Sequence, residues 1–233
     1  MDLYYTTEFN EKKAVLKGQE ASHCSRVRRH RPGDLIRLTN GLGTKMTGQI
    51  ATVQKTEVVI DVLEYTTCPY DKHVLPTIAI SIIKNPSRFE WLVEKITEIG
   101  VERIIPLICH RTEKKSVRLD RLERIAISAL KQSEGWYKPH ISSPVTFTTF
   151  VEEANSERKF IASYSSQNAQ LSDLKPKPHT TVLIGPEGDF TNEEIETAKQ
   201  NGFQRVNLGS NRLRVETAGM VACVLTNDPT RPQ

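Results

Sequence analysis

The stretch Val182-Leu-Ile-Gly-Pro-Glu-Gly-Asp-Phe-Thr191 decides the fold of this chain, and Val206-Asn-Leu-Gly-Ser-Asn-Arg-Leu-Arg-Val-Glu-Thr-Ala218 repeats its design. Each half begins with a short apolar strand that stops at a glycine turn, and a helix follows at once. The first strand ends at Gly185-Pro186, because proline interrupts strand pairing. Gly188 can adopt a positive φ or let a ligand approach the main chain closely. Such turns direct backbone amides and carbonyls outward, so they are suited to form a binding site.

Helix boundaries follow from the residues around these turns. Thr191-Asn-Glu-Glu194 is a capping box, so a helix is expected to begin at about Asn192 and to stop at Gly202. After the second turn, Glu216-Thr-Ala-Gly-Met-Val-Ala-Cys-Val-Leu225 is small and apolar enough to form a buried helix. A single Gly-Pro-Glu-Gly is usually an ordinary β-turn. Two glycine turns in one α/β segment, the second rich in arginine, indicate a site.

The two motifs together resemble those of a known family. Leu183-Ile-Gly-Pro-Glu-Gly188 followed by Leu208-Gly-x-x-Arg-Leu-Arg-x-Glu-Thr-Ala218 resembles the signature of the SPOUT methyltransferases. Among these it is most similar to the 16S ribosomal RNA (uracil(1498)-N(3))-methyltransferases, the RsmE family. The resemblance implies an α/β fold with a SPOUT-type parallel sheet and a C-terminal trefoil knot, preceded by a small PUA-like β-barrel domain. It also implies S-adenosylmethionine as cofactor, a uridine of 16S ribosomal RNA in the small ribosomal subunit as methyl acceptor, and a homodimer.

The resemblance further implies roles for individual residues. The cofactor pocket is expected to contain six positions of the two turns, namely Leu183, Gly185, Gly188, Leu208, Gly209 and Leu213. Arg214 is expected to orient the uracil or to stabilise its anion, because a guanidinium stays protonated and cannot accept the proton. Glu187 and Glu216 are further candidates, for proton handling or for holding Arg214 in place. A carboxylate at a helix start that interacts with the helix dipole is an equal alternative for Glu216, and the general base stays unassigned.

Composition restricts the class of protein. The 233 residues allow one large or two small domains with a sizeable core. The hydrophobic content of 37% and charged content of 26% are typical of a soluble protein, and no apolar run approaches the ~20 residues of a membrane span. No signal peptide is recognisable at the N-terminus, so a cytoplasmic protein is expected. The four cysteines lack a CxxC pair and nearby histidines at metal-ligand spacing, so reduced thiols and no metal are expected.

The net charge of +4 is unevenly distributed. Residues 26 to 37 contain five arginines against one acid, Asp34. A charge run is usually a solvated face, but arginine suits bidentate contacts with phosphate. The run therefore favours nucleic-acid binding, and the resemblance implies that Arg26, Arg28 and Arg29 bind ribosomal RNA.

The first part of the chain, residues 1 to 70, is expected to form the small β-barrel. Short alternating runs predict strands at 14–16, 35–38 and 58–63, with a hairpin turn at Asn40-Gly41. One basic helix is expected at about 19–29. The residues that resemble the PUA-like domain of the family are His23, Arg29, Gly33-Asp34 and Asn40-Gly41.

The pattern changes after a hinge at about 66–76. Apolar runs at 77–83, 103–108 and 159–163 predict buried strands that alternate with helices at 89–99 and from Asp120 onward. This alternation predicts a parallel sheet that helices cover on both faces. The resemblance implies that residues 76–233 form the methyltransferase domain.

Two further basic residues and one departure from the family pattern concern RNA. Lys84 and Arg88 lie where a strand end meets a helix start, and they resemble the RNA-facing element of the family. A solvated loop explains either residue alone equally well. The family usually has Gly-Arg where this chain has Gly135-Trp136, so one arginine contact is missing or replaced by a stacking tryptophan.

Two other functions are alternatives to a methyltransferase. A non-catalytic RNA-binding factor of ribosome assembly could retain the SPOUT fold, and cofactor binding would distinguish it from an enzyme. A P-loop or Rossmann enzyme lacks the required glycine motifs after a strand. The sequence does not give the exact nucleotide that is methylated, nor whether the substrate is free RNA or the assembled subunit.

Overall fold

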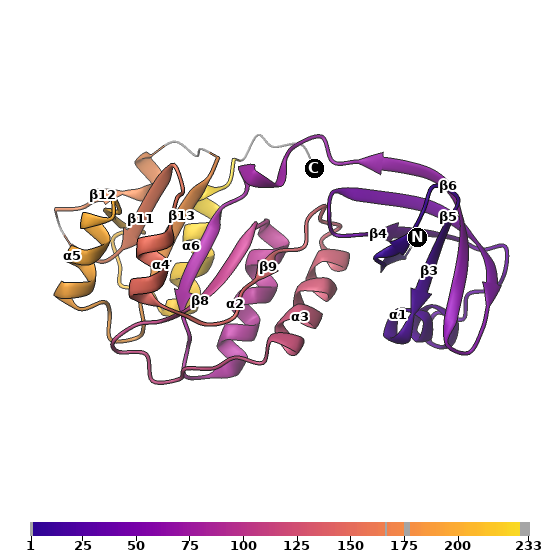
Figure 1. Cartoon of the computed structure of the whole chain (residues 1–233), viewed down its shortest axis with the longest axis horizontal. Helices are drawn as coiled ribbons and strands as arrows, with labels where there is room; N and C mark the ends of the chain where they lie inside the picture. The colour runs from indigo at the N-terminus through magenta and orange to yellow at the C-terminus, as the bar shows by residue number, and fades with distance from the viewer. Residues whose placement is uncertain (1, 166, 175–177, 229–233) are drawn as a thin grey trace. The chain divides into compact units, whose positions relative to one another are not determined.

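The computed structural model describes residues 2–165, 167–174 and 178–228 (Figure 1). The chain folds as two compact units, Met1–Pro69 with Leu130–Lys138, and Tyr70–Ala129 with Pro139–Gln233. The expected division at 1–70 and 76–233 had placed the short segment Leu130–Lys138 in the second domain. The first unit has its own hydrophobic core, and the second unit has two further core clusters.

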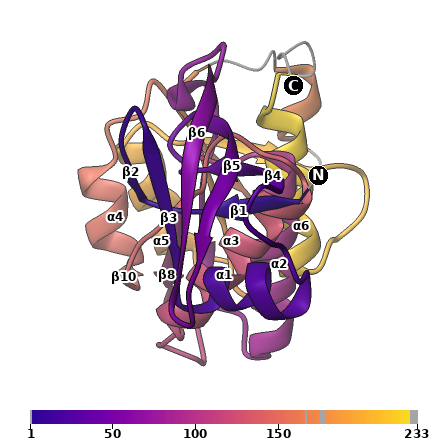
Figure 2. The same ribbon diagram turned by 90° about the vertical axis from the view of Figure 1, so that its right-hand side faces the viewer.

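The first unit is built on a mixed six-stranded sheet in the order β1-β4-β5-β6-β3-β2 (Figure 2). Its strands are β1 Leu3–Tyr5, β2 Glu8–Phe9, β3 Lys13–Lys17, β4 Leu35–Thr39, β5 Thr44–Val53 and β6 Glu57–Thr67. Neighbouring strands are antiparallel except β1 and β4, which are parallel. The expected strands lie within β3, β4 and β6. Asn40-Gly41 forms the turn between β4 and β5, where Gly41 has a φ of 64°.

The basic helix of this unit is shorter than expected. An α-helical turn, α1 (Gly18–Ser22), continues into a π-helical turn, η1 (His23–Val27). Arg29 has a φ of 57°, in the left-handed region, so a right-handed helix cannot continue through it. The prediction of a helix over 19–29 is therefore correct up to Val27 and wrong for the two arginines that follow.

The second unit contains a parallel sheet in the order β10-β8-β7-β13-β11-β14-β12, and β9 also pairs with β8. All of its strand pairs are parallel, which confirms the predicted sheet. Its elements are η2 Lys72–Val74, β7 Thr77–Ser81, α2 Pro86–Ile99, β8 Arg103–Ile108, α3 Leu119–Gln132, β9 His140–Ile141, β10 Val145–Thr146, α4 Phe147–Glu153, β11 Arg158–Ala162, β12 Ala169–Gln170, η3 Leu171–Asp173, β13 Thr180–Ile184, α5 Asn192–Gln200, β14 Gln204–Asn207 and α6 Val215–Thr226.

Helices cover both faces of this sheet. Helices α2, α3 and α6 cover one face, and α4 and α5 cover the other (Figure 1). Successive side chains of a strand point to opposite faces, so Val182 and Ile184 belong to the first cluster and Leu183 to the second. All five residues of β13 are buried for this reason.

Local signals set the ends of the helices that position the site. Asn85 caps α2 by accepting a hydrogen bond from the backbone N–H of Ser87, and Pro86 occupies the first turn. The predicted capping box of α5 is present between Thr191 and Glu194. Gly202 follows this helix with a φ of 83°, as expected for a residue that ends a helix.

Strand β11 lies between β13 and β14 and pairs with both. Because the three strands are parallel, their carboxyl ends lie at one edge of the sheet, where both glycine turns begin. Within the described part of the chain, no helix combines the length and the apolar character needed to cross a membrane. The four cysteines are free thiols, and Cys68 alone among them is not buried.

Candidate active site

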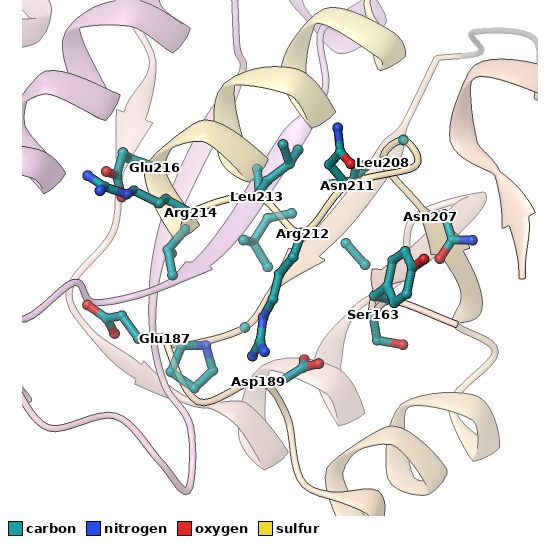
Figure 3. Close-up of a pocket in the computed structure, with 18 of the residues that line it drawn as sticks. Ser163, Glu187, Asp189, Asn207, Leu208, Asn211, Arg212, Leu213, Arg214 and Glu216 are labelled. Atoms are coloured by element: carbon teal, nitrogen blue, oxygen red, sulfur yellow. The ribbon is translucent and has the colours of Figure 1, made fainter. Parts of the chain in front are cut away.

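A cavity of about 470 Å³ lies at the carboxyl ends of β11, β13 and β14 (Figure 3). In open parallel sheets this edge is where ligands bind, and the volume is within the range of small-molecule sites. The cavity is lined by three segments after these strands, and Arg88 of α2 also lines it. These segments contribute Ser163, Tyr164, Gly185, Pro186, Glu187, Asp189, Asn207, Leu208, Gly209, Asn211, Arg212, Leu213, Arg214 and Glu216.

The first glycine turn forms one wall of the cavity. The backbone N–H of Asp189 donates to the carbonyl of Pro186 over 2.9 Å, which closes the turn. A Cβ added to Gly185 would lie 3.0 Å from the ring of Phe190, so close packing favours glycine there. Of the two roles suggested for Gly188, a positive φ is not found there; the residue of this turn with a positive φ is Asp189, at 65°. The carboxylate of Asp189 accepts a hydrogen bond from the backbone N–H of Phe190 over 2.8 Å.

The second glycine turn forms the opposite wall and leads into α6. Gly209 has a φ of 139°, which L side chains rarely adopt, and an added Cβ would meet no heavy atom within 4 Å. Arg214 occupies the N-cap position of α6 but its side chain makes no capping hydrogen bond. The first-turn amides of α6 therefore carry the partial positive charge of a helix N-terminus beside the cavity.

Three carboxylates line the cavity and differ in their surroundings. Glu187 is exposed and accepts a hydrogen bond from the backbone N–H of Lys84 over 3.3 Å. Asp189 is engaged with its own turn through Phe190. Glu216 is 9% exposed and receives no hydrogen bond from any residue that the structure describes. Its nearest cation is Arg88, whose Nε lies 3.7 Å from Oε1 of Glu216.

Two arginines of the second turn are available to a ligand. Arg212 and Arg214 are exposed side chains that line the cavity (Figure 3). Neither makes a hydrogen bond or an ion pair within residues 2–165, 167–174 and 178–228. Glu216 forms an ion pair with Arg88, so the idea that Glu216 holds Arg214 in place finds no contact in the structure.

The structure brings most of the expected site residues together. Gly185, Leu208, Gly209 and Leu213 line the cavity, as do Glu187, Arg214 and Glu216. Leu183 and Gly188 do not. Leu183 is completely buried in the core beneath α4 and α5, and Gly188 lies against the side chain of Arg111, 3.1 Å from the position of an added Cβ.

Several lining residues were not anticipated from the sequence, among them Ser163, Tyr164 and Asn207. Asn207 is 5% exposed, and its amide bonds the main chain of Ser165 in both directions, at 3.1 and 2.8 Å. It thereby fixes the loop after β11 to the end of β14. The available signal was their position directly after predicted strands, where residues of a parallel sheet converge.

The expected RNA-binding residues differ in whether their charges form ion pairs within the protein. The side chain of Arg28 forms an ion pair with Asp2, and this hydrogen bond is the main cause that lowers the pKa of the Asp2 carboxyl to about 2. Arg26 and Arg29 are exposed and make no ion pair within the described residues. Lys84 Nζ lies 2.7 Å from the carboxylate of Glu113.

Trp136 does not offer a stacking surface in place of the missing family arginine. It is 9% exposed, and Lys45 Nζ lies 3.9 Å from the centroid of its ring. Glu134, two residues earlier, forms an ion pair with Arg37 over 2.6 Å. The segment thus packs on the first unit.

Comparisons with known proteins identify the family of this chain. Residues 71–227 match the family model of an RNA methyltransferase domain, and residues 16–63 match that of an RNA methyltransferase PUA domain. The ribosomal RNA small subunit methyltransferase E of Rickettsia conorii is 30% identical over 217 residues, which cover 91% of this chain and 88% of that relative.

Among the solved structures that are similar over nearly the whole chain are the following two. One, described as a "probable rRNA-methyltransferase" from Porphyromonas gingivalis, has 35% sequence identity and a TM-score of 0.88, with 96% of this chain and 95% of that chain covered. The other is a ribosomal RNA small subunit methyltransferase E from Neisseria gonorrhoeae bound to S-adenosyl methionine. It has 29% identity and a TM-score of 0.84, with 96% and 95% covered.

Proposed function

Since this chain belongs to the RNA methyltransferase family that includes the ribosomal RNA small subunit methyltransferases E, we propose that it methylates N3 of a specific uridine in 16S ribosomal RNA. S-adenosylmethionine is the methyl donor, as the bound ligand of a similar solved structure supports. The observation that carries the proposal is the cavity between the two glycine turns, which combines an unpaired arginine with a buried carboxylate. A non-catalytic assembly factor would have no need of this combination.

The residues of the two turns fit the proposed cofactor. S-adenosylmethionine would supply an electrophilic methyl group on a sulfonium. The cavity volume of about 470 Å³ suits a molecule of that size. Gly185 and Gly209 bring main chain to the cavity wall, and Leu208 and Leu213 add apolar side chains, which suits binding of an adenosine group.

Arg214 would act on the methyl acceptor. Nitrogen N3 of uracil attacks as its proton leaves, and negative charge develops on the ring. An exposed guanidinium at the cavity can donate hydrogen bonds to a uracil oxygen and stabilise that charge. The uncapped N-terminus of α6 adds a favourable field of the same sign.

Glu216 is the carboxylate best placed to receive the N3 proton. Glu187 already accepts a hydrogen bond in a solvent-exposed position, and Asp189 is used by its own turn. The lone pairs of Glu216 are not used by any donor within hydrogen-bonding distance among the described residues. Its Oε1 lies 3.7 Å from Nε of Arg88, the one cation that forms an ion pair with it among the described residues.

The first unit would hold the ribosomal RNA through Arg26, Arg28 and Arg29, with Lys84 and Arg88 as contacts near the cavity. Arg28 would contribute less than its neighbours, because its charge is already paired with Asp2. The protein would act in the cytoplasm, where ribosomal subunits are assembled. We also propose that the chain forms a trefoil knot at the two signature turns.

A homodimer is also proposed. The helices α2 and α6 pack against each other, and each has an exposed apolar side chain, Trp91 at 39% and Val224 at 53%. A second copy could cover these side chains through an isologous contact. Light scattering at micromolar concentration should give the mass of a dimer, and a monomer mass would contradict this proposal.

Two measurements test the enzymatic function. Mass spectrometry of small-subunit ribosomal RNA from cells that lack the protein should show loss of one methyl group from a uridine. The purified protein with S-adenosylmethionine should restore it. Restored methylation at a different atom or base would refute the assignment to uracil N3, and absence of any cofactor binding by calorimetry would favour the assembly factor.

A further inference from the structure

The loop between β8 and α3, residues 109–118, is strongly basic. It contains Arg111, Lys114, Lys115 and Arg118 against a single acid, Glu113. That acid is neutralised from outside the loop, because Lys84 Nζ lies 2.7 Å from its carboxylate. The loop therefore presents an excess of positive charge on the second unit.

The base of this loop is fixed beside the cavity. Thr112 is 5% exposed, and its hydroxyl shares a hydrogen bond of 2.8 Å with Ser81 at the end of β7. Arg111 donates a hydrogen bond to the carbonyl of Gly188 in the first glycine turn over 2.5 Å. The backbone N–H of His110 donates to Glu194 of the capping box over 2.8 Å. The cations of the loop are thus held at a defined place next to the turn that lines the cavity.

A second, smaller cavity lies under the basic end of the loop. Its volume is about 200 Å³, and Lys114, Ser116 and Arg118 stand at it together with Glu90 of α2. The remaining lining is largely apolar and consists of Ile82, Ile83, Pro86, Phe89, Val117 and Leu122. This cavity and the larger one lie on two sides of the start of α2, because Arg88 lines one while Phe89 and Glu90 line the other.

Some of the cationic side chains of the loop form ion pairs within the protein, and others do not. Glu90 is held mainly by Arg121, whose Nε lies 2.5 Å from its carboxylate, while Arg118 is 3.9 Å away. Lys114 and Lys115 make no hydrogen bond or ion pair with a residue in the described ranges. Cations above an apolar hollow match what a single-stranded nucleotide offers, namely a phosphate and an apolar ring face.

We propose that the β8–α3 loop is a second RNA-binding surface, which holds backbone phosphates next to the target nucleotide through Lys114 and Lys115. The inference rests on the proposed function, because it takes the larger cavity as the site of the target uracil. It separates two tasks: the arginines of the first unit attach the RNA, and the loop positions the strand at the cavity. A solvated charged loop would not need its base tied to the signature turn or a hollow beneath its cations.

The test compares two double variants of the full chain. Lys114→Ala with Lys115→Ala removes two charges from the loop. Lys72→Ala with Arg103→Ala removes two exposed charges near the starts of β7 and β8, at the opposite edge of the parallel sheet. The probe is 16S ribosomal RNA transcribed in vitro. Binding is measured by filter retention over a range of salt concentrations, and methylation is measured separately.

Two lost phosphate contacts should lower the slope of log K against log salt by about 1.4 and weaken RNA binding about tenfold near 0.15 M salt. The cofactor affinity of the loop variant should stay at the wild-type value, its rate at saturating RNA should fall because the strand is no longer positioned, and the control should match wild type in RNA binding and rate. The proposal is overturned if the loop variant keeps the wild-type slope, or if both variants lose the same affinity. A wild-type protein that binds the RNA but transfers no methyl group would contradict the proposed function and leave the comparison of the two variants valid.

Discussion

Replacing Glu216 by glutamine tests the assignment of the proton acceptor. Glutamine keeps the shape of the side chain but cannot accept a proton, so methyl transfer must proceed without a general base. Such bases contribute 10²–10⁴ to rate in general, and a loss of about 10² or more in single-turnover rate is therefore expected. The alternative role of Glu216, a carboxylate that only interacts with the helix dipole, predicts that the substitution lowers stability and leaves the rate unchanged.

The structure indicates that the fold should tolerate this change. The only ion pair of Glu216 among the described residues joins it to Arg88 over 3.7 Å, and the Arg88 side chain is 44% exposed. A pair with one solvated partner at this distance contributes at most about 1 kcal/mol. The melting temperature and the S-adenosylmethionine affinity of Glu216→Gln should thus stay close to those of the wild type.

The pH dependence gives a second readout. If Glu216 accepts the N3 proton, the rate deficit of Glu216→Gln should shrink at alkaline pH, where the imide N3–H of uracil begins to ionise without help. Glu187→Gln is the matched control, and because Glu187 is exposed it should keep a rate within about threefold of wild type. A Glu216→Gln rate near wild type, or a pH-independent loss together with weaker cofactor binding, would refute the reasoning.

Three further predictions follow from the same structure. Arg214→Ala should keep the fold and the cofactor affinity but lose on the order of 10²–10³ in single-turnover rate, as expected for one preorganised donor; weakened cofactor binding with near-normal turnover would place it in the cofactor pocket instead. Alanine at Arg26, Arg28 and Arg29 together should lower the salt slope of RNA binding by about 1.4, the effect of two free arginines, since Arg28 is paired; filter binding measures this, and an unchanged slope would show a solvated face. Gly219→Ala should cost about 1–3 kcal/mol of unfolding free energy in urea denaturation, because its Cβ would lie 2.7 Å from Ile80; a stability equal to wild type would show that α6 can shift.

The parts of the fold that short-range interactions determine were predictable from the sequence. The start of α5 depends on two reciprocal hydrogen bonds between Thr191 and Glu194, of 2.9 and 3.2 Å, and both residues belong to one four-residue motif. The buried strands appeared as apolar runs because helices cover both faces of the sheet. The predicted basic helix of the first unit extended two residues too far, because an arginine does not indicate the left-handed backbone that Arg29 adopts.

Contacts between distant segments were not predictable. The ion pair of Glu216 with Arg88 joins the start of α6 to the first turn of α2, and no local pattern relates the two. The prediction that Leu183 lines the cofactor pocket assumed that every residue of the motif faces the ligand. Strand alternation places its side chain on the face covered by α4 and α5, so this residue supports the turn from beneath the sheet.

Some residues that line the cavity were not predicted from the sequence, and the physical reason is the order of strands in the sheet. The sequence gives three successive apolar strands, β11, β13 and β14, and sequential strands usually lie side by side in chain order. Here β11 lies between the other two, so the connection from β13 through α5 to β14 passes across it. The residues that follow β11 then emerge between the two glycine turns, which brings Ser163 and Tyr164 into the cavity. A cavity at the ends of three adjacent strands is closed on more sides than a cavity between two turns. The segment after β11 carries no sequence motif, so its part in the cavity was not predicted.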